Sequence, residues 1–301
     1  MKSLDTYIFE KLKIRKNKVF YVTDEDSFED YINKQYDSNN KYLNLQNISF
    51  ELYDDKDNTH KPVYQQYIIH KLVGIFIYKN NVRTVDVSNW KFGNYISLSE
   101  LFDGCYNLIN IIGLDTWDVS NIKTMNGLFG GCSKLKDLSD IKYWNVSSCN
   151  NFFRMFDYCT VLSELDLSGW TLPNKMSNIR KMFARCNKLK QLKGIENWNV
   201  ESVEYPEDMF VGCTLLKELD LSKWKLKPRS TIRMFSNCYS LETIGNVSNW
   251  DFSDNLNTTD MFNGCRKLIL DMSMLTMNVS VTKIRMFKDA NTKIKKPKIN
   301  K

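Results

Sequence analysis

Cysteine is the residue type whose spacing in this sequence most invites a chemical role. Seven of the eight cysteines form a regular series, with a phenylalanine three residues before each: Cys105, Cys132, Cys159, Cys186, Cys213, Cys238 and Cys265. The series could form a disulfide ladder or a metal site, but thiolate metal sites need clustered partners. The only histidines, His60 and His70, lie outside it. We therefore predict a buried column of reduced thiols, with no metal and no cofactor.

The eighth cysteine and the histidines add no catalytic arrangement. Cys149 stands where Ile122 and Val203 stand in their repeats, and it is predicted to be a core residue. The sequence contains no nucleophile elbow, P-loop, dinucleotide fingerprint or zinc-protease helix. His60 or His70 could act as a general base, but neither has partners placed beside it. We expect no enzymatic activity and no catalytic residues.

Aspartates recur in the stretches where apolar and polar residues alternate. They could bind a cation along the face of a sheet, or they could lie outward between leucines and bond to the serine two residues on. The residues concerned are Asp86, Asp166 and Asp220, with Ser88, Ser168 and Ser222.

The net charge of +7 comes from one end of the chain. Residues 283–301 hold eight Lys or Arg and one acid, Asp289, so the rest of the chain is neutral. A neutral body makes nucleic acid an unlikely partner, although the basic end could contact nucleic acid or an acidic surface. A short lysine-rich terminus is more typical of a disordered, solvated tail, which we predict for residues 291–301.

The elements that position these residues follow from an internal repeat. All seven tryptophans recur at intervals of 26 to 28 residues, in register with the phenylalanine and cysteine series: Trp90, Trp117, Trp144, Trp170, Trp198, Trp224 and Trp250. A degenerate last copy has Leu275 in the tryptophan position and Ala290 in the cysteine position. Three registered series predict a solenoid of about 7.5 coils, each stacked on its neighbours.

Each unit is predicted to contain one short strand and one short helical return. After Val119 the apolar residues recur every three or four positions, which favours a helical turn capped by Ser120. The alternation in 165–168 and 219–222 favours strands. Some units carry one extra residue beside the strand, often with a glycine (Gly113, Gly194, Gly245), which a β-bulge would absorb.

The string Met155-Phe156-x-x-Cys159-x-x-Leu162-x-x-Leu165-Asp166-Leu167-Ser168-x-Trp170 resembles the repeat of the BspA family of leucine-rich repeat surface proteins. The resemblance covers roughly residues 82–290. It implies an α/β fold: a right-handed leucine-rich-repeat-like solenoid of parallel strands and short helical turns, in a family associated with adhesion and protein binding. We divide the chain into an N-terminal α/β cap or docking domain (1–80), the solenoid (81–290) and the tail (291–301).

Residues 1–80 show no copy of the repeat. We expect an opening helix, a strand at 19–22, a helix through Ile32, and strands within 42–50 and 68–78, together shielding the first coil. No signal peptide or membrane span is apparent, so the location is unknown, with a cytoplasmic or virion-associated protein as the options. The opening LDTYIFEKLKIRKNK is weakly similar to proteins of tailed phages.

The expected function is a non-enzymatic module that binds or adheres to a protein or glycan partner through its repeat surface. The alternative is a structural or accessory component of a phage or virus particle, docked to virion proteins through residues 1–80. Charged residues recur at matching positions beside successive strands and define the candidate partner-binding face: Glu164, Lys190, Gln191, Lys217 and Glu218.

Overall fold

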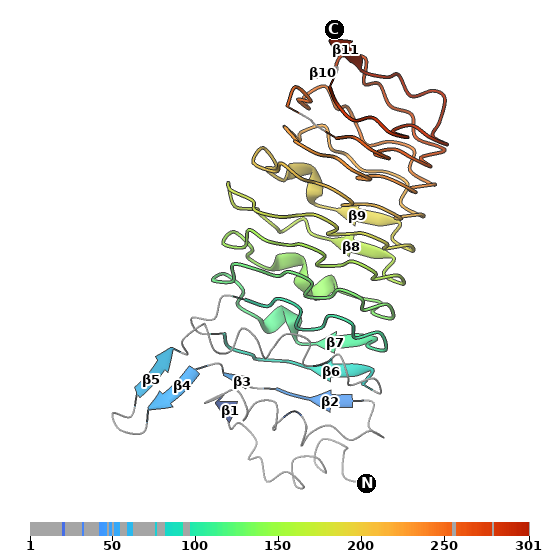
Figure 1. Ribbon diagram of the computed structural model, residues 1–301. Helices are drawn as coiled ribbons and strands as arrows, with labels where there is room; N and C mark the ends of the chain where they lie inside the picture. The colour runs from blue at the N-terminus through green and yellow to red at the C-terminus, as the bar shows by residue number, and fades with distance from the viewer. Residues whose placement is uncertain are drawn as a thin grey trace.

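The predicted repeat takes the form of a stack of coils. The computed structural model describes residues 20–21, 32, 42–46, 48–49, 51–54, 59–62, 76, 82–92, 97–254, 257–278 and 280–300. Within these ranges the chain climbs from the N-terminal segment to strand β11 at the opposite end (Figure 1). Among the described residues regular elements are short, because each coil turns back after only a few residues.

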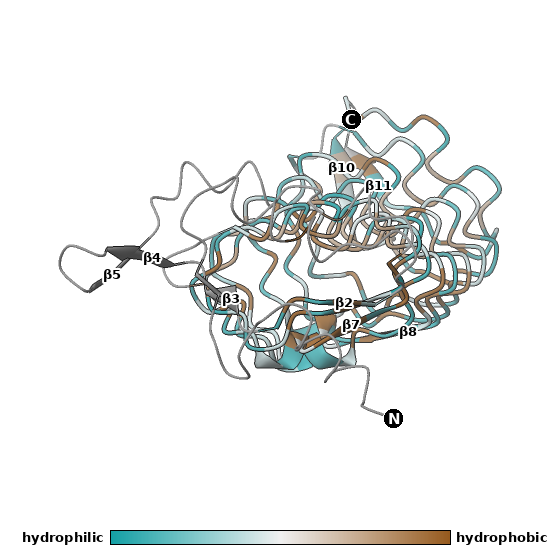
Figure 2. Ribbon diagram, turned by 90° about the horizontal axis from the view of Figure 1, so that it is seen from below, coloured by the Kyte–Doolittle hydropathy of each residue, from teal (hydrophilic) through white to brown (hydrophobic). Residues whose placement is uncertain are grey.

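One side of the stack carries the strands, as the alternation predicted. They are β6 (Thr84–Asp86), β7 (Asn110–Ile112), β8 (Glu164–Asp166) and β9 (Gln191–Lys193). β6 pairs in parallel with β7, and β8 pairs in parallel with β9, which places Leu165 opposite Leu192. Viewed from below, β2, β7 and β8 lie along the same side of the stack (Figure 2). The central residue of each three-residue strand points inward and is buried.

The N-terminal segment extends the sheet of the first coil. Its strand β2 (Tyr42–Asn44) pairs in parallel with β6, and the indole Nε1 of Trp90 donates to the carbonyl of Leu45 at 2.6 Å. Two further pairs are β1 (Phe20–Tyr21) with β3 (Ile48–Ser49), which are parallel, and β4 (Glu51–Asp54) with β5 (Thr59–Pro62), which are antiparallel. The predicted opening helix lies outside the described residues, as do the helix before Ile32 and, apart from Phe76, the strand at 68–78.

The returns, the segments between the tryptophan and the cysteine of each coil, are not helical as the sequence suggested. In the return before Cys132, the N–H groups of Leu128, Gly130 and Cys132 each donate to the carbonyl three residues earlier. Gly127 and Gly131 have φ of 59° and 71°, which ends each turn before a helix can continue. The return is therefore a run of successive tight turns, and these share the apolar spacing of three to four residues with a helix.

The remaining N–H groups of each return connect neighbouring coils. Those of Gly127, Phe129 and Gly131 donate to carbonyls of the following coil, at 2.7 to 2.9 Å. Alternate N–H groups thus bond within the coil and to the next coil. The same alternation recurs along the array, so the backbone of the returns is satisfied by stacking as much as by the turns themselves.

Two of the predicted columns are continuous inside the stack. Nine phenylalanine rings, from Phe76 through Phe102 and on to Phe287, lie one above the other with centroids 5.1 to 5.9 Å apart. All eight cysteines are buried as free thiols, as predicted. From Cys132 onward each column thiol donates to the carbonyl of the phenylalanine in the preceding coil, at 3.0 to 3.2 Å.

In the coils of Gly113 and Gly194 the extra residue forms a 3-10 turn instead of the predicted β-bulge, whereas the longer coil of Gly245 has no 3-10 helix among its described residues. Gly113 and Gly194, with φ of 89° and 92°, lead from strands β7 and β9 into η1 (Leu114–Thr116) and η3 (Ile195–Asn197). A further 3-10 helix is η2 (Ser139–Tyr143). A Cβ atom on Gly194 would lie 2.2 Å from the backbone nitrogen of Ser168, so the neighbouring coil also requires glycine there.

The prediction of a disordered tail is wrong for residues 291–300. Strand β11 (Lys298–Asn300) pairs in parallel with β10 (Thr276–Asn278), and Ile294 is buried. Lys295 Nζ lies 2.8 Å from Asp271 Oδ2, and its N–H donates to the carbonyl of Leu270. The lysines lie on the surface of an ordered coil, and the buried apolar residues of that coil face the core.

Candidate binding face

The structure brings the five predicted face residues together on the strand side. Glu164 and Gln191 begin β8 and β9 and lie opposite one another, with Glu218 in the same column one coil further. Lys190 and Lys217 occupy the adjacent column, where the N–H of Lys190 donates to the carbonyl of Ser163 at 2.8 Å. All five side chains are exposed. None forms an ion pair with a described residue.

Strand alternation explains the outward placement of Glu164, Gln191 and Glu218. Leu165, Leu192 and Leu219 point into the core, so the residue before each of them points to solvent. Adjacent parallel strands are about 4.8 Å apart, which sets the spacing of the charged columns. The face therefore presents two parallel rows, one acidic or neutral (Glu164, Gln191, Glu218) and one basic (Lys190, Lys217).

A groove of about 600 Å³ borders this face, and sequence reasoning missed it. Its lining comes from four successive coils: Asp166, Ser168, Leu192, Lys193, Glu196, Glu218, Leu219, Asp220, Ser222, Thr243 and Gly245. The hollow lies where the longer coil with η3 stands between two shorter coils. The extra residue at Gly194 is the sequence signal that could have located it.

Carboxylates dominate the groove, and their surroundings favour the charged form. Lys142 Nζ lies 2.8 Å from Asp166 Oδ2 and, together with Ser168, lowers the pKa of Asp166 to about 2. The hydroxyl of Ser222 donates to Asp220 Oδ1 at 2.6 Å, and the hydrogen bonds from Ser222 lower the pKa of Asp220. Lys193 is the single cation among the lining residues. The groove is thus negatively charged at neutral pH.

The strand aspartates make the serine hydrogen bonds of the second prediction, but Asp86 does not lie outward: it is buried, and Tyr42 and Gln46 also donate to it. Asp86, Asp166 and Asp220 each accept a hydrogen bond from the N–H of the serine two residues on. Among the described residues no group of three or more His, Cys, Asp or Glu side chains is arranged to hold a metal ion. His60 lies in β5, and His70 lies outside the described residues.

From Cys132 onward, the thiols of the cysteine column are held in their protonated form. Burial raises the pKa of Cys159, Cys186 and Cys213 well above the usual value, and it raises that of Cys265 to about 12. A thiol that stays protonated and donates to a carbonyl is a poor nucleophile and a poor metal ligand.

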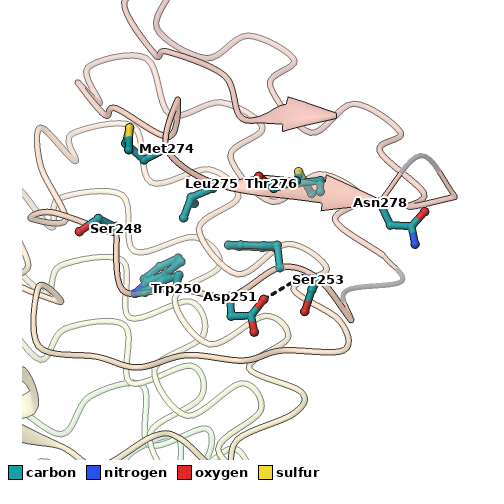
Figure 3. Close-up of a pocket in the computed structure, with 10 residues that line it drawn as sticks. Ser248, Trp250, Asp251, Ser253, Met274, Leu275, Thr276 and Asn278 are labelled. Atoms are coloured by element: carbon teal, nitrogen blue, oxygen red, sulfur yellow. Dashed lines mark hydrogen bonds between the residues drawn. The ribbon is translucent and has the colours of Figure 1, made fainter. Parts of the chain in front are cut away.

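A second hollow, of about 560 Å³, lies near the C-terminal end of the stack (Figure 3). It forms where the tryptophan column ends, because Leu275 replaces tryptophan in the coil after Trp250. Asp251 accepts a hydrogen bond from the N–H of Ser253 at 2.9 Å, which lowers its pKa. Trp250 Nε1 is buried without a hydrogen-bond partner, and Met274 is exposed at the rim. No charged column of the strand face reaches this hollow.

Across the described residues, no helix has the length and apolar character needed to cross a membrane.

Comparisons with solved structures return leucine-rich repeat proteins at low similarity. A leucine-rich repeat protein from Bacteroides ovatus ATCC 8483 is 15% identical, with 86% of this chain and 69% of that chain covered and a TM-score of 0.40. A leucine rich cell surface protein from Faecalibacterium prausnitzii A2-165 is 14% identical, with 87% and 88% covered and a TM-score of 0.27. A chain of the TLR13-ssRNA13 complex is 12% identical, with 93% and 46% covered and a TM-score of 0.26.

No curated protein matches the sequence. None of the three solved structures is described as a phage or virus protein. One family model matches the chain twice, over residues 70–193 and again over 177–300, so that the two matches span nearly the whole coil stack. The chain therefore belongs to the family described as "Mycoplasma protein of unknown function, DUF285".

Proposed function

We propose that this protein is a non-enzymatic binding module that engages a protein partner through its strand face. The observation that carries the proposal is the alignment of Glu164, Gln191 and Glu218 in one exposed column and of Lys190 and Lys217 in the next. Charges that are exposed and have no ion-pair partner among the described residues remain available to a partner.

The arrangement favours an extended protein surface with charges of both signs. An acidic or neutral row beside a basic row selects a partner with the complementary rows, because like charges brought face to face weaken binding. The negatively charged groove extends the acidic side of the face and suits a basic side chain inserted from the partner. A repeat scaffold holds these rows in register over several coils.

The test begins with a photo-reactive amino acid in place of Gln191, at the centre of the face, to cross-link and identify the partner. The affinity of that partner is then measured for the wild type and for the double variant Lys190→Glu, Lys217→Glu. We expect a loss of about tenfold or more, since close charge pairs across an interface contribute roughly 1.5 kcal/mol or more each.

The double variant Lys283→Glu, Lys288→Glu is the matched control, because it changes the net charge equally at the end of the stack. We expect it to bind the strand-face partner like the wild type. Unchanged affinity in the Lys190/Lys217 variant, with loss in the control, would assign binding to the basic end and overturn the proposal.

A further inference from the structure

The C-terminal end of the coil stack presents a row of backbone donors. The last return includes residues 282–289. The N–H groups of the preceding coil donate to its carbonyls at 2.8 to 2.9 Å; they belong to Thr258, Asp260, Phe262 and Gly264. The equivalent groups of the last return are the N–H of Lys283, Arg285, Phe287 and Asp289. None of these four donates to an acceptor among the described residues.

The equivalence of these positions rests on backbone and packing. Asp260 and Arg285 both have positive φ, at 56° and 52°, and Phe262 stacks on Phe287 at 5.8 Å. Within the last return, Met286 and Lys288 still donate to the carbonyls three residues earlier. The alternation of hydrogen bonds found along the array therefore persists in the last return. Every second N–H group bonds within the return, and the N–H groups between them, which in other coils donate to the next coil, have no acceptor among the described residues.

A column of alternating acidic and basic side chains on successive returns, which we call the charge ladder, also ends at the last return. Arg233 donates twice to Asp208, at 2.6 and 3.0 Å, and Arg285 donates twice to Asp260, at 2.8 and 2.6 Å. The carboxylates of both Asp208 and Asp260 stabilise the charge of Arg233, whereas Arg285 has only Asp260. The next position in the ladder would hold a carboxylate.

The surroundings of this end are apolar and basic. The side chains of Ile284 and Ile299 are 59% and 50% exposed, although isoleucine is usually buried. Lysines 283, 288, 293, 296 and 298 have no carboxylate partner among the described residues. An extended segment that offers carbonyls and acidic side chains would satisfy both the donors and the charges.

We propose that this end of the stack docks an acidic, extended segment of a partner protein, which continues the hydrogen-bond ladder and places a carboxylate beside Arg285. A second copy meeting end to end fits poorly, for two reasons. Its last return would bring N–H donors toward N–H donors, and its lysines would face lysines. The proposed contact uses different residues from the strand face and does not depend on it.

A peptide copied from this chain provides a defined probe. Residues 204–216 form an acidic return whose carbonyls at Glu207, Met209 and Val211 accept from the N–H groups of a basic coil, those of Lys181, Phe183 and Arg185. A synthetic peptide of this sequence, with Cys213→Ser, is titrated into the full-length protein. The control peptide also carries Glu207→Gln and Asp208→Asn.

Amide hydrogen exchange reports the contact residue by residue. In the free protein we expect the N–H groups of residues 283, 285, 287 and 289 to exchange faster than those of residues 286 and 288. The acidic peptide should slow the first set, and the control peptide, which keeps only Glu204 of the three acids, should bind about tenfold or more weakly, with a smaller difference at about 1 M salt. The Lys283→Glu, Lys288→Glu variant should lose the peptide, whereas the Lys190→Glu, Lys217→Glu variant should keep it.

Several results would overturn the proposal. Slow exchange of all four N–H groups in the free protein would show that they are already bonded. Protection that rises with protein concentration would assign the end to a second copy. Equal binding of the two peptides, or no protection at millimolar acidic peptide, would remove the acidic segment as the occupant.

Discussion

The phenylalanine column allows a direct test of how stacking stabilises this fold. Phe183 is fully buried, with the rings of Phe156 and Phe210 at 5.6 and 5.5 Å on either side. Phe287, at the end of the column, is partly buried and has one ring neighbour among the described residues, at 5.8 Å. We expect Phe183→Ala to lower the free energy of unfolding by about 3 to 5 kcal/mol, which is usual for a buried phenylalanine.

Phe287→Ala should cost only about 1 to 2 kcal/mol, because it removes a single aromatic pair, worth roughly 0.5 to 1.5 kcal/mol, and a smaller buried area. Urea unfolding followed by circular dichroism measures both losses, and an unchanged m-value checks that unfolding stays cooperative. Phe183→Leu keeps most of the volume and should lose about 1.5 kcal/mol or less. Equal losses for the two alanine variants would mean that stacking between coils does not set the stability.

Three further predictions follow from other parts of the coil. The column thiols should resist a thiol reagent in the native protein and react on unfolding; rapid native labelling of Cys159 or Cys186 would contradict their burial. The pKa of Asp166 is lowered from 3.8 to about 2 in the folded state, so its contribution is present above about pH 4 and is lost as the pH falls toward 2. Asp166→Asn should therefore lower the urea midpoint at pH 5 but hardly at pH 2, and an equal loss at both would refute the ion pair with Lys142. Gly194→Ala should destabilise more than Gly212→Ala, because both have positive φ but the nearest atom to the added Cβ is 2.2 Å away at Gly194 and 3.6 Å at Gly212; equal urea midpoints would argue against a clash.

Sequence patterns predicted the columns well because the type of a residue and its spacing along the repeat determine whether it packs in the core. Trp117, Phe129 and Cys132 lie inside the stack in the register that their spacing indicates. Strand alternation likewise placed Gln191 and Glu218 outward. These inferences need only the side chain and its distance along the chain.

The returns and the tail were mispredicted for physical reasons. An apolar residue every three or four positions fits both a helix and a run of tight turns, and Arg233 and Asp260 adopt positive φ where the sequence shows no glycine. Neighbouring coils supply the hydrogen bonds that hold those residues there, and composition does not show them. In the tail, five lysines within residues 291–301 suggested disorder, although Ile294 packs in the core. The groove was missed because it arises from a one-residue difference in length between coils.

The alternate hydrogen bonds between coils also determine how the molecule responds to load. Tension applied near residue 300 acts on the outermost coil first, so bonds break in succession, as in a zipper, and the coils beneath stay intact. Each coil of 26 to 28 residues would release about 90 Å of extended chain at roughly 3.3 to 3.6 Å per residue. We expect force spectroscopy to show regular steps of that length at modest force. A stack built in this way would therefore lengthen under tension by whole coils.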